Sequence, residues 1–389
     1  ITDELAYSMN GQNAHFGSPI NGADPMRISG GSSSGSASAV SNRLCDFALG
    51  SDTGGSVRAP ANHCGLVGMR PSHGRISLDD TLALSPSLDT CGWFTRDVPT
   101  FARVADVLFG EDAHALPESV RLLVPNDIWG LAAPAAVKAL KPVRGQIEAC
   151  LGKARAVNIA LDDFDTMFWH FRAIQGSEAW DVDGGFIRRF APVLGPGVAE
   201  RFQWASELSD EKVAAAQVFR QRWREHIAAI LGTDGVLLMP TMPDLAPLIS
   251  TSEADLDDYR NRATRMLCGA GRHRGHHLIR IGIAHLDHIV CKDFFASDAH
   301  GFVSNFFCRC HLEPHSSSRC LICGHRPSSD NRGFLKRRAV RFFFNPLLVF
   351  KFAKRLWRAH VERRFTALPL ARHNKKHQNF AIGAHLANP

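Results

Sequence analysis

The sequence predicts an α/β fold whose sheet is largely covered by helices, and three observations support that prediction. Strand-like and helix-like segments alternate along the first 270 residues. Short apolar runs at 45–50 and 234–240 are bounded by Gly or Pro, as buried strands usually are. Two turns rich in Gly and Ser, 28–36 and 51–56, are separated by a helix and a strand, so we expect them to meet over one edge of the sheet.

The elements of the first half follow from periodicity and end signals. Residues 37–44 are expected to form a short helix that leads into the buried strand 45–50. Residues 97–109 predict a helix, because Asp97 is a suitable N-cap and apolar residues recur at helical spacing. Residues 121–125 form an apolar strand, and the Ala-rich stretch 131–151 forms a helix that Pro142 is expected to break.

The second half continues the alternation. Residues 156–161 are a strand candidate, and residues 163–232 are mostly helical in pattern, with breaks at 183–185 and 195–197 where glycines gather. Residues 234–240 form a buried strand that ends at Pro240. The sequence contains no internal repeat.

Composition bounds the class of protein. The chain has 389 residues, 45% of them hydrophobic and 21% charged, which is typical of a globular protein. No apolar run reaches the roughly 18 to 20 residues of a membrane-spanning helix. The chain begins at Ile1 without a basic and apolar leader, so we expect no secretory signal and a true start further upstream. Ten cysteines without regular spacing favour free thiols, and we expect a cytoplasmic protein.

The charge is divided unevenly along the chain. Residues 1–270 contain 24 Lys and Arg against 32 Asp and Glu, a net charge of −8, whereas residues 271–389 contain 21 against 6, a net charge of +15. The second segment also holds 13 of the 19 His residues. Such a jump indicates a separate basic module or a stretch of different coding origin.

Hydroxyl groups at the tips of glycine-rich turns indicate acyl transfer, because a nucleophilic Ser needs nearby N–H groups that reach a developing oxyanion. The candidate oxyanion hole is formed by the N–H groups of Thr53, Gly54, Gly55 and Ser56, and Ser56 is the candidate nucleophile. A base is also required, and His63 and His73 leave a Ser-His-Asp arrangement open. No phosphate-binding or dinucleotide fingerprint is present, so we expect no nucleotide and no other cofactor.

Two motifs then resemble a known family. Gly-Gly-Ser-Ser-Ser-Gly-Ser-Ala at 30–37 is followed by Asp-Thr-Gly-Gly-Ser-Val-Arg-Ala-Pro at 52–60, which places Ser56 24 positions after Ser32. This pair resembles the signature of the amidase signature family of serine hydrolases. The resemblance covers about residues 1–271, and the segments 3–7 and 89–94 are similar to the branch that contains indole-acetamide hydrolases.

The resemblance implies an α/β/α fold with a mixed central sheet and the hydrolysis of a linear carboxylic amide to an acid and ammonia. It implies a Ser-Ser-Lys triad in which Ser56 is the nucleophile and Ser32, next to a cis peptide, is the bridging serine. The same resemblance assigns the oxyanion hole to the N–H groups of residues 53–56. We expect Asp52, Arg58 and Ser33 to support the signature loops, with Arg58 paired to Asp52.

Two departures from the family pattern affect the prediction. The family's Lys lies further upstream than the 31 residues that precede Ser32, and the first Lys of this chain is Lys138, so we expect an incomplete fold and weak catalysis. The family pattern stops after residue 271. We therefore divide the chain into a partial amidase-signature domain, 1–271, and a basic tail rich in His, Cys and Arg, 272–389, which we expect to be out of frame or non-coding.

The tail leaves functional alternatives open. Its sulfur-rich part has one Cys-x-x-Cys pair and one Cys-x-Cys pair, which is only half of a zinc pattern, so we expect no metal site at Cys308, Cys310, Cys320 and Cys323. Basic and aromatic residues alternate over 337–358, a composition that suits an anionic membrane or a nucleic acid, although we expect neither partner.

A small-molecule amide is therefore the expected partner, and a homodimer is left open. The alternatives are an amidotransferase-type subunit that works with a partner, and an inactive fragment or pseudoenzyme with a basic tail. Trp169, with Phe168 and Phe171 beside it, is a candidate lining of the acyl pocket, although such clusters usually pack in cores.

Overall fold

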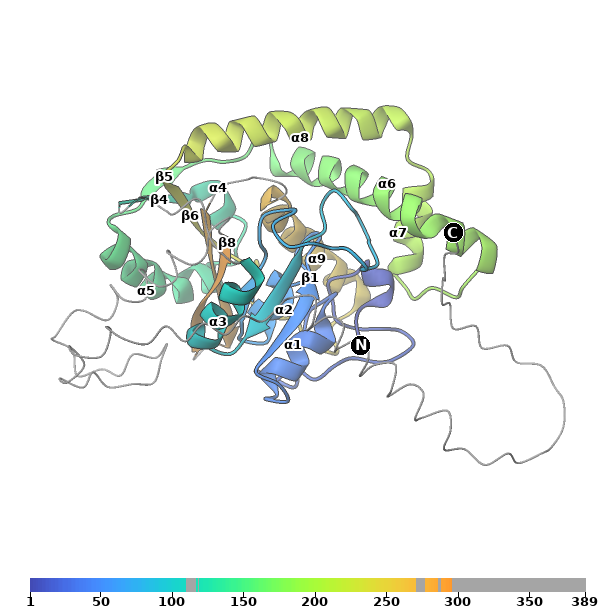
Figure 1. The fold of residues 1–389 in the computed structure, drawn as a ribbon, viewed down its shortest axis with the longest axis horizontal. Helices are drawn as coiled ribbons and strands as arrows, with labels where there is room; N and C mark the ends of the chain where they lie inside the picture. Colours follow the sequence, from blue (N-terminus) through green and yellow to red (C-terminus); the bar gives the residue numbers. More distant parts are fainter. Residues whose placement is uncertain (110–116, 118, 271–276, 286–287, 296–389) are drawn as a thin grey trace. The chain divides into compact units, whose positions relative to one another are not determined.

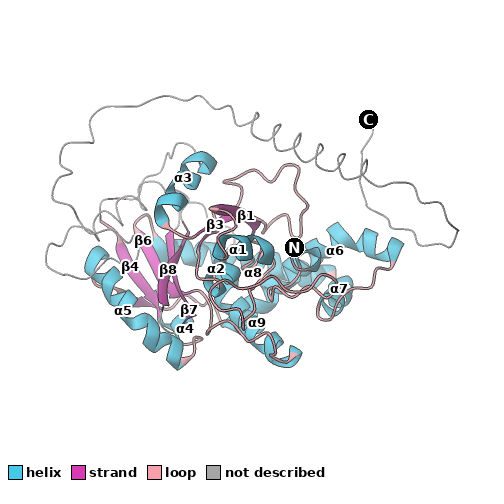
Figure 2. Ribbon diagram, turned by 90° about the horizontal axis from the view of Figure 1, so that it is seen from below, coloured by secondary structure: helices cyan, strands magenta, loops and turns pink. Residues whose placement is uncertain are grey.

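The computed structural model describes residues 1–109, 117, 119–270, 277–285 and 288–295, all within one unit of the chain, residues 1–325. A central sheet is surrounded by helices (Figures 1 and 2). The helices are α1 Ser34–Ser41, α2 Arg58–His63, α3 Val98–Phe109, α4 Asn126–Trp129, α5 Pro134–Leu151, α6 Phe164–Phe190, α7 Val198–Ser206, α8 Asp210–Leu231 and α9 Glu253–Leu267. Short 3-10 helices lie at Glu4–Ala6 and Cys268–Ala270. The strands are β1 Phe47–Ser51, β2 Val67–Met69, β3 Cys91–Thr95, β4 Arg121–Pro125, β5 Arg155–Val157, β6 Gly235–Pro240, β7 His277–His285 and β8 His288–Phe295.

The described strands join into one sheet of mixed direction, in the order β1-β3-β2-β8-β7-β6-β4-β5. β3 runs antiparallel to both β1 and β2, and β7 runs antiparallel to β8. The other pairs, from β2 with β8 to β4 with β5, are parallel. The mixed central sheet expected from the family resemblance is therefore confirmed.

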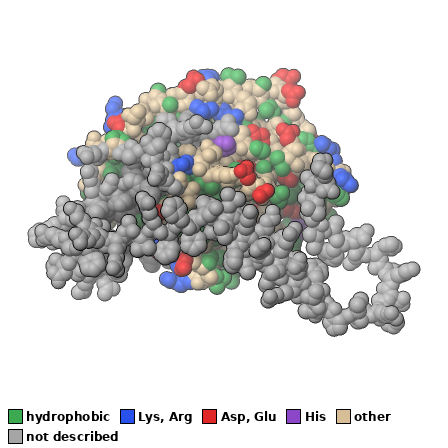
Figure 3. All heavy atoms as spheres, in the orientation of Figure 1, with side chains coloured by type: hydrophobic (Ala, Val, Ile, Leu, Met, Phe, Trp, Pro, Cys, Tyr) green, Lys and Arg blue, Asp and Glu red, His purple; other side chains and the backbone are tan. Residues whose placement is uncertain are grey.

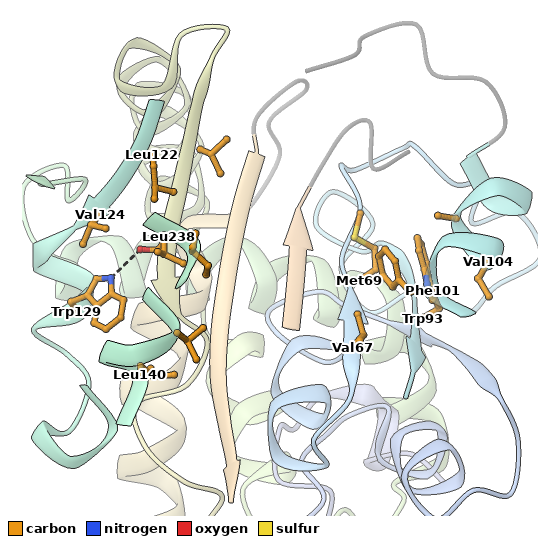
Figure 4. Packing of buried hydrophobic residues seen from close by; sticks show 14 of the residues in the cluster. Val67, Met69, Trp93, Phe101, Val104, Leu122, Val124, Trp129, Leu140 and Leu238 are labelled. Carbon is orange, nitrogen blue, oxygen red and sulfur yellow. Dashed lines mark hydrogen bonds between the residues drawn. The ribbon is translucent and has the colours of Figure 1, made fainter. Parts of the chain in front are cut away.

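Helices cover both faces of this sheet, because successive side chains of a strand point to opposite sides. In β4, Leu122 and Val124 pack into a core that also contains residues of α3 and α5, among them Phe101 and Leu140 (Figure 4). Leu123, between them, packs into a second core with residues of α8. All six residues of β6 are buried, as the sequence predicts for a strand covered on both sides.

β1 differs from the prediction of a buried strand. Phe47 and Leu49 are 47% and 46% exposed. The reason is topological: β1 is at the end of the sheet and pairs only with β3, so one edge and part of one face remain open. An apolar run flanked by Gly does not distinguish an edge strand from a central one.

Two predicted helix breaks are also wrong. α5 continues through Pro142, since the proline removes one backbone hydrogen bond while Leu140 and Val143 on either side are buried in the core. α6 also continues through residues 183–185, where Gly184 leaves room for the ring of Trp180, one turn earlier in the same helix; an added Cβ would lie 2.7 Å from that ring. The predicted break at 195–197 is confirmed, since α6 ends at Phe190 and α7 begins at Val198.

Two strands lie beyond the boundary expected at residue 271. β7 pairs with β6 and β8 pairs with β2, so these strands occupy the centre of the sheet. The alternation of apolar residues in Leu-Ile-Arg-Ile-Gly-Ile at 278–283 explains why this stretch forms a strand. The four tail cysteines 308, 310, 320 and 323 and the basic run 337–358 lie outside the described residues.

Three further properties of the molecule bear on its function. No helix in the described ranges is long and apolar enough to cross a membrane. Within the same ranges, no three His, Cys, Asp or Glu side chains are grouped in a way that would hold a metal ion. On the face shown in Figure 3, acidic and basic side chains of the described residues are interspersed.

Candidate active site

The two Gly/Ser turns lie side by side. The Ser33 N–H donates to the Ser56 carbonyl over 3.3 Å. The Ser33 hydroxyl accepts from the Ser51 N–H and donates to the Ser51 carbonyl, both over 3.1 Å. Ser33 therefore ties the first turn to the end of β1 and to the second turn. Because Ser33, the neighbour of Ser32, is hydrogen-bonded to the backbone of Ser56, the two candidate serines lie on adjacent, connected turns.

The first turn is fixed by the segment that precedes it. The Gly31 N–H donates to the Met9 carbonyl over 2.9 Å, and the Asp3 N–H donates to the Ser32 carbonyl over 3.0 Å. The Asp3 carboxylate, which accepts from the Gly11 N–H over 3.1 Å, occupies the space that a side chain at Gly31 would need. The peptide bond between Gly31 and Ser32 is cis, the feature that the resemblance places next to the bridging serine.

Asp52 organises the second turn. Its carboxylate accepts from the N–H groups of Gly55 (2.9 Å), Val57 (3.1 Å) and Arg58 (3.2 Å). It also forms ion pairs of 2.8 Å with Arg58 and Arg70. Burial alone would raise the pKa of Asp52, but the two guanidinium groups and the N–H donors hold it well below its usual range. The turn is thus wrapped around a carboxylate that stays charged.

This arrangement changes the expected oxyanion hole. The Gly55 N–H, one of the four donors predicted from the sequence, points at Asp52 and is not free for a ligand. The N–H groups of Thr53, Gly54 and Ser56 have no acceptor among the residues that the structure describes. Three N–H groups at or within three positions of the candidate nucleophile are therefore without an acceptor in the described residues.

The two candidate serines carry free hydroxyl groups. Ser32 is 2% exposed and Ser56 is 6% exposed, and neither hydroxyl has a hydrogen-bond partner in the described part of the chain. Both residues are buried, but neither hydroxyl oxygen is fully shut off from solvent, so each can meet a ligand. The described lysines, Lys138, Lys141, Lys153 and Lys212, are all exposed, and none is bonded to either serine.

The histidines left open as a base are not paired with these serines. The His63 ring is buried and its Nε2 lies 3.0 Å from the Tyr259 hydroxyl. Burial lowers the pKa of His63 to about 3, so the ring is neutral. His73 Nε2 contacts the Pro86 carbonyl. The Ser-His-Asp alternative therefore has no support in the described residues.

Side chains from distant parts of the sequence enclose the second turn. A Cβ added to Gly54 would lie 2.8 Å from Phe171 Cζ and 3.4 Å from Gln175 Nε2, both on α6. A Cβ added to Gly55 would lie 2.6 Å from Leu267 Cδ1 on α9 and 3.4 Å from Met9 Sδ. Of these four, only Phe171 was singled out from the sequence, because no local pattern marks the others.

Trp169 has a different surrounding. It is 55% exposed, and its aromatic neighbours are Phe168 and Trp204, with ring centroids 5.1 and 6.2 Å away. The aromatic side chain that lies against Gly54 is instead that of Phe171, two positions after Trp169.

A cluster of three arginines, which the sequence did not predict, lies near Tyr7. The three residues are Arg172 on α6, Arg201 on α7 and Arg260 on α9. Burial lowers the pKa of Arg201 to about 9, and the positive charges of Arg260 and Arg172 contribute to this shift. Arg201 is 7% exposed and donates through Nε to the Tyr7 carbonyl over 2.7 Å, while its Nη1 has no partner in the described residues. Arg172 Nε and the Tyr7 hydroxyl are also buried without a partner there. Asp257 forms an ion pair of 2.7 Å with Arg260.

Comparisons with known proteins agree with the resemblance. The family model called Amidase matches residues 1–144. Amidase 1 of Arabidopsis thaliana is 36% identical over 301 residues, which cover 70% of this chain and 71% of the relative. A glutamyl-tRNA(Gln) amidotransferase subunit of Methanobrevibacter smithii is 29% identical over 283 residues, which cover 66% of this chain and 62% of the relative. A crystal structure of an amidase superposes with a TM-score of 0.61 at 28% identity, covering 68% of this chain and 63% of that one. The chain thus spans between about three fifths and seven tenths of the length of these relatives.

Proposed function

The chain belongs to the amidase signature family, and we propose that it hydrolyses a carboxylic amide to an acid and ammonia with Ser56 as the nucleophile. The observation that carries this proposal is the pair of serines, Ser32 and Ser56, whose hydroxyls bond to no described residue and keep some access to solvent, beside three N–H groups without an acceptor in the described residues. This combination suits a reaction that passes through an oxyanion.

The proposed reaction has two halves. The Ser56 oxygen attacks the amide carbon, its proton passes to the Ser32 side, and the carbonyl electrons move onto oxygen, where the N–H groups of Thr53, Gly54 and Ser56 stabilise the charge. The carbonyl reforms as the C–N bond breaks, and the leaving nitrogen takes the proton that Ser56 gave up, returned by way of Ser32, and departs as ammonia. Water then attacks the Ser56 ester, releases the acid and returns the proton to Ser56.

A base must accept the proton that Ser32 relays. The resemblance assigns this role to a Lys, but none of the described lysines contacts the serine pair. General-base assistance is typically worth about 10²- to 10⁴-fold in rate. We therefore propose slow turnover for this chain, limited by formation of the acyl-enzyme.

The arginine cluster supports a preference for amides that carry an acidic group. Buried guanidinium groups need counter-charges, yet Asp257 is the only carboxylate paired with Arg172, Arg201 or Arg260 in the described residues. The cluster adjoins the turns because Tyr7, bonded to Arg201, lies two positions before Met9, which contacts Gly31 and Gly55.

This preference is measured as kcat/KM for succinamate against butanamide, which differ by one carboxylate. We expect succinamate to be the better substrate and Arg201→Met to remove the difference. Equal values for the two amides in the unmodified chain would contradict the preference without affecting the role of Ser56.

A second candidate is a protein that delivers ammonia to a partner. It is favoured by the similarity to a glutamyl-tRNA(Gln) amidotransferase subunit. Copurification of a partner, together with glutamine-dependent ammonia release that the partner stimulates, would support it. Release from simple amides by the isolated chain favours the first proposal.

The test of the proposal is ammonia release from phenylacetamide and succinamate by the full chain, compared with Ser56→Ala, Ser32→Ala and Ser36→Ala. Ser36 lies in the same Gly/Ser segment, and we place it outside the machinery. We expect Ser56→Ala to abolish turnover, Ser32→Ala to lower it strongly, and Ser36→Ala to leave it unchanged. Unchanged turnover in Ser56→Ala would overturn the proposal.

A further inference from the structure

Gln175 is a largely buried residue whose side-chain amide has no hydrogen-bond partner among the described residues. It lies in the middle of α6, the residue is 9% exposed, and its side chain forms no hydrogen bond with any described residue. The residue as a whole is largely buried, but its amide atoms are not completely shut off from solvent. The amide can therefore meet a ligand that enters beside the turn, and no side chain of the described residues competes for its hydrogen bonds.

The position of Gln175 indicates which ligand. Its Nε2 atom and Phe171 Cζ are the atoms nearest to the side-chain position of Gly54, at 3.4 and 2.8 Å. Residues 171 and 175 are one turn apart and therefore share a face of α6. The amide group thus lies over the turn that carries the free N–H groups of Gly54 and its neighbours.

The turn also lacks one of its expected donors, because the Gly55 N–H is committed to Asp52. A neutral amide N–H is a suitable replacement, since it stays protonated at every pH and introduces no charge beside the carboxylate of Asp52. The side chain of Gln175 offers such a donor on the Gly54 side of the turn.

We propose that Gln175 is a further catalytic residue, which donates its Nε2–H to the substrate oxygen as that oxygen becomes an oxyanion. The inference rests on the proposed function. In the step concerned, the Ser56 oxygen forms a bond to the amide carbon and the carbonyl electron pair moves onto oxygen. Gln175 donates a hydrogen bond to that oxygen and transfers no proton. When the pair returns and the C–N bond breaks, this hydrogen bond weakens again.

The experiment compares Gln175→Met and Gln175→Glu with Gln146→Met in the full chain. Methionine keeps the length of the side chain without a donor, and Gln146 is an exposed residue of α5 that receives the same change. The readouts are kcat and KM for phenylacetamide, with thermal unfolding measured in parallel. We expect Gln175→Met to lower kcat by about 10²- to 10³-fold, the usual effect of removing an oxyanion donor, with KM nearly unchanged. Gln146→Met should match the unmodified chain.

Gln175→Glu decides the matter if the Met variant fails to fold, because Glu has the shape of Gln. Its carboxylate opposes the oxyanion, whereas the protonated acid can donate a hydrogen bond. We expect the ratio of its kcat to that of the unmodified chain to rise as the pH is lowered. A kcat for Gln175→Met within about threefold of the unmodified value, or a pH-independent ratio for Gln175→Glu, would overturn the inference. Loss of turnover in Ser56→Ala in the same assay would show that the proposed function nevertheless stands.

Discussion

Replacing Asp52 by Asn tests the electrostatic centre of the second turn. The substitution keeps the size of the side chain but removes its negative charge. Arg58 and Arg70, each 1% exposed, would then remain buried without the carboxylate that pairs with both. The new NH₂ group of Asn would also face N–H groups that now donate to Asp52, among them that of Val57. We therefore expect a large loss of stability.

The size of the loss follows from the burial of the partners. Breaking a buried ion pair by removing one partner typically costs about 3 to 5 kcal/mol. Because the pKa of Asp52 is lowered on folding, its contribution is present above about pH 4, the ordinary pKa of Asp, and is lost as the pH falls below that value. The effect should therefore be measured near pH 7.

The assay is urea unfolding of the full chain, with the free energy of unfolding taken from the midpoint and slope. Asp46→Asn is the matched control, because Asp46 also pairs with an arginine, Arg96, over 2.9 Å, but its side chain is 81% exposed. An exposed pair of this kind contributes at most about 1 kcal/mol. A loss for Asp52→Asn no larger than that of Asp46→Asn would refute the reasoning.

Two further predictions concern proton transfer and pH. Burial lowers the pKa of His63 to about 3, so between roughly pH 6.5 and 3 the unfolded chain binds a proton that the folded chain does not. The free energy of unfolding should therefore fall as the pH is lowered through this range, by up to about 1.4 kcal/mol per pH unit. His63→Gln should make this fall shallower. The same dependence on pH in His63→Gln and the unmodified chain would count against a neutral buried ring. Because no described lysine contacts the serine pair, methylamine at pH 9 should accelerate ammonia release by the chain, within the roughly 10⁴-fold limit of general-base assistance, and should have no effect on Ser56→Ala. A rate independent of methylamine would show that the chain already holds an effective base.

The sequence predicts the features of this fold that depend on local pattern. The predicted strand 234–240 nearly matches the observed β6, because a short apolar run that ends at Pro favours a strand buried on both faces. The proximity of the two Gly/Ser turns also follows from the sequence, because a helix and a strand between them bring both to one sheet edge. In contrast, the edge position of β1 depends on which strands become its neighbours, and no residue of β1 encodes that.

The parts of the site that the sequence missed are supplied by distant segments. Gln175 and Leu267 approach the turn at 54 and 55 across more than one hundred positions of chain, so their role exists only after α6 and α9 have packed. The same holds for Arg201, whose partner is the Tyr7 carbonyl. The use of the Gly55 N–H by Asp52 was equally hidden, because a Gly-rich motif does not specify which N–H groups remain free.

The most direct test of the central claim is covalent labelling of the nucleophile. The full chain is incubated with a fluorophosphonate ester for several hours and then mapped by peptide mass spectrometry, with Ser56→Ala as the comparison. The account predicts one adduct on Ser56 in the unmodified chain and none at that position or elsewhere in Ser56→Ala. An adduct on another residue that persists in Ser56→Ala, while the chain releases ammonia from an amide, would contradict it.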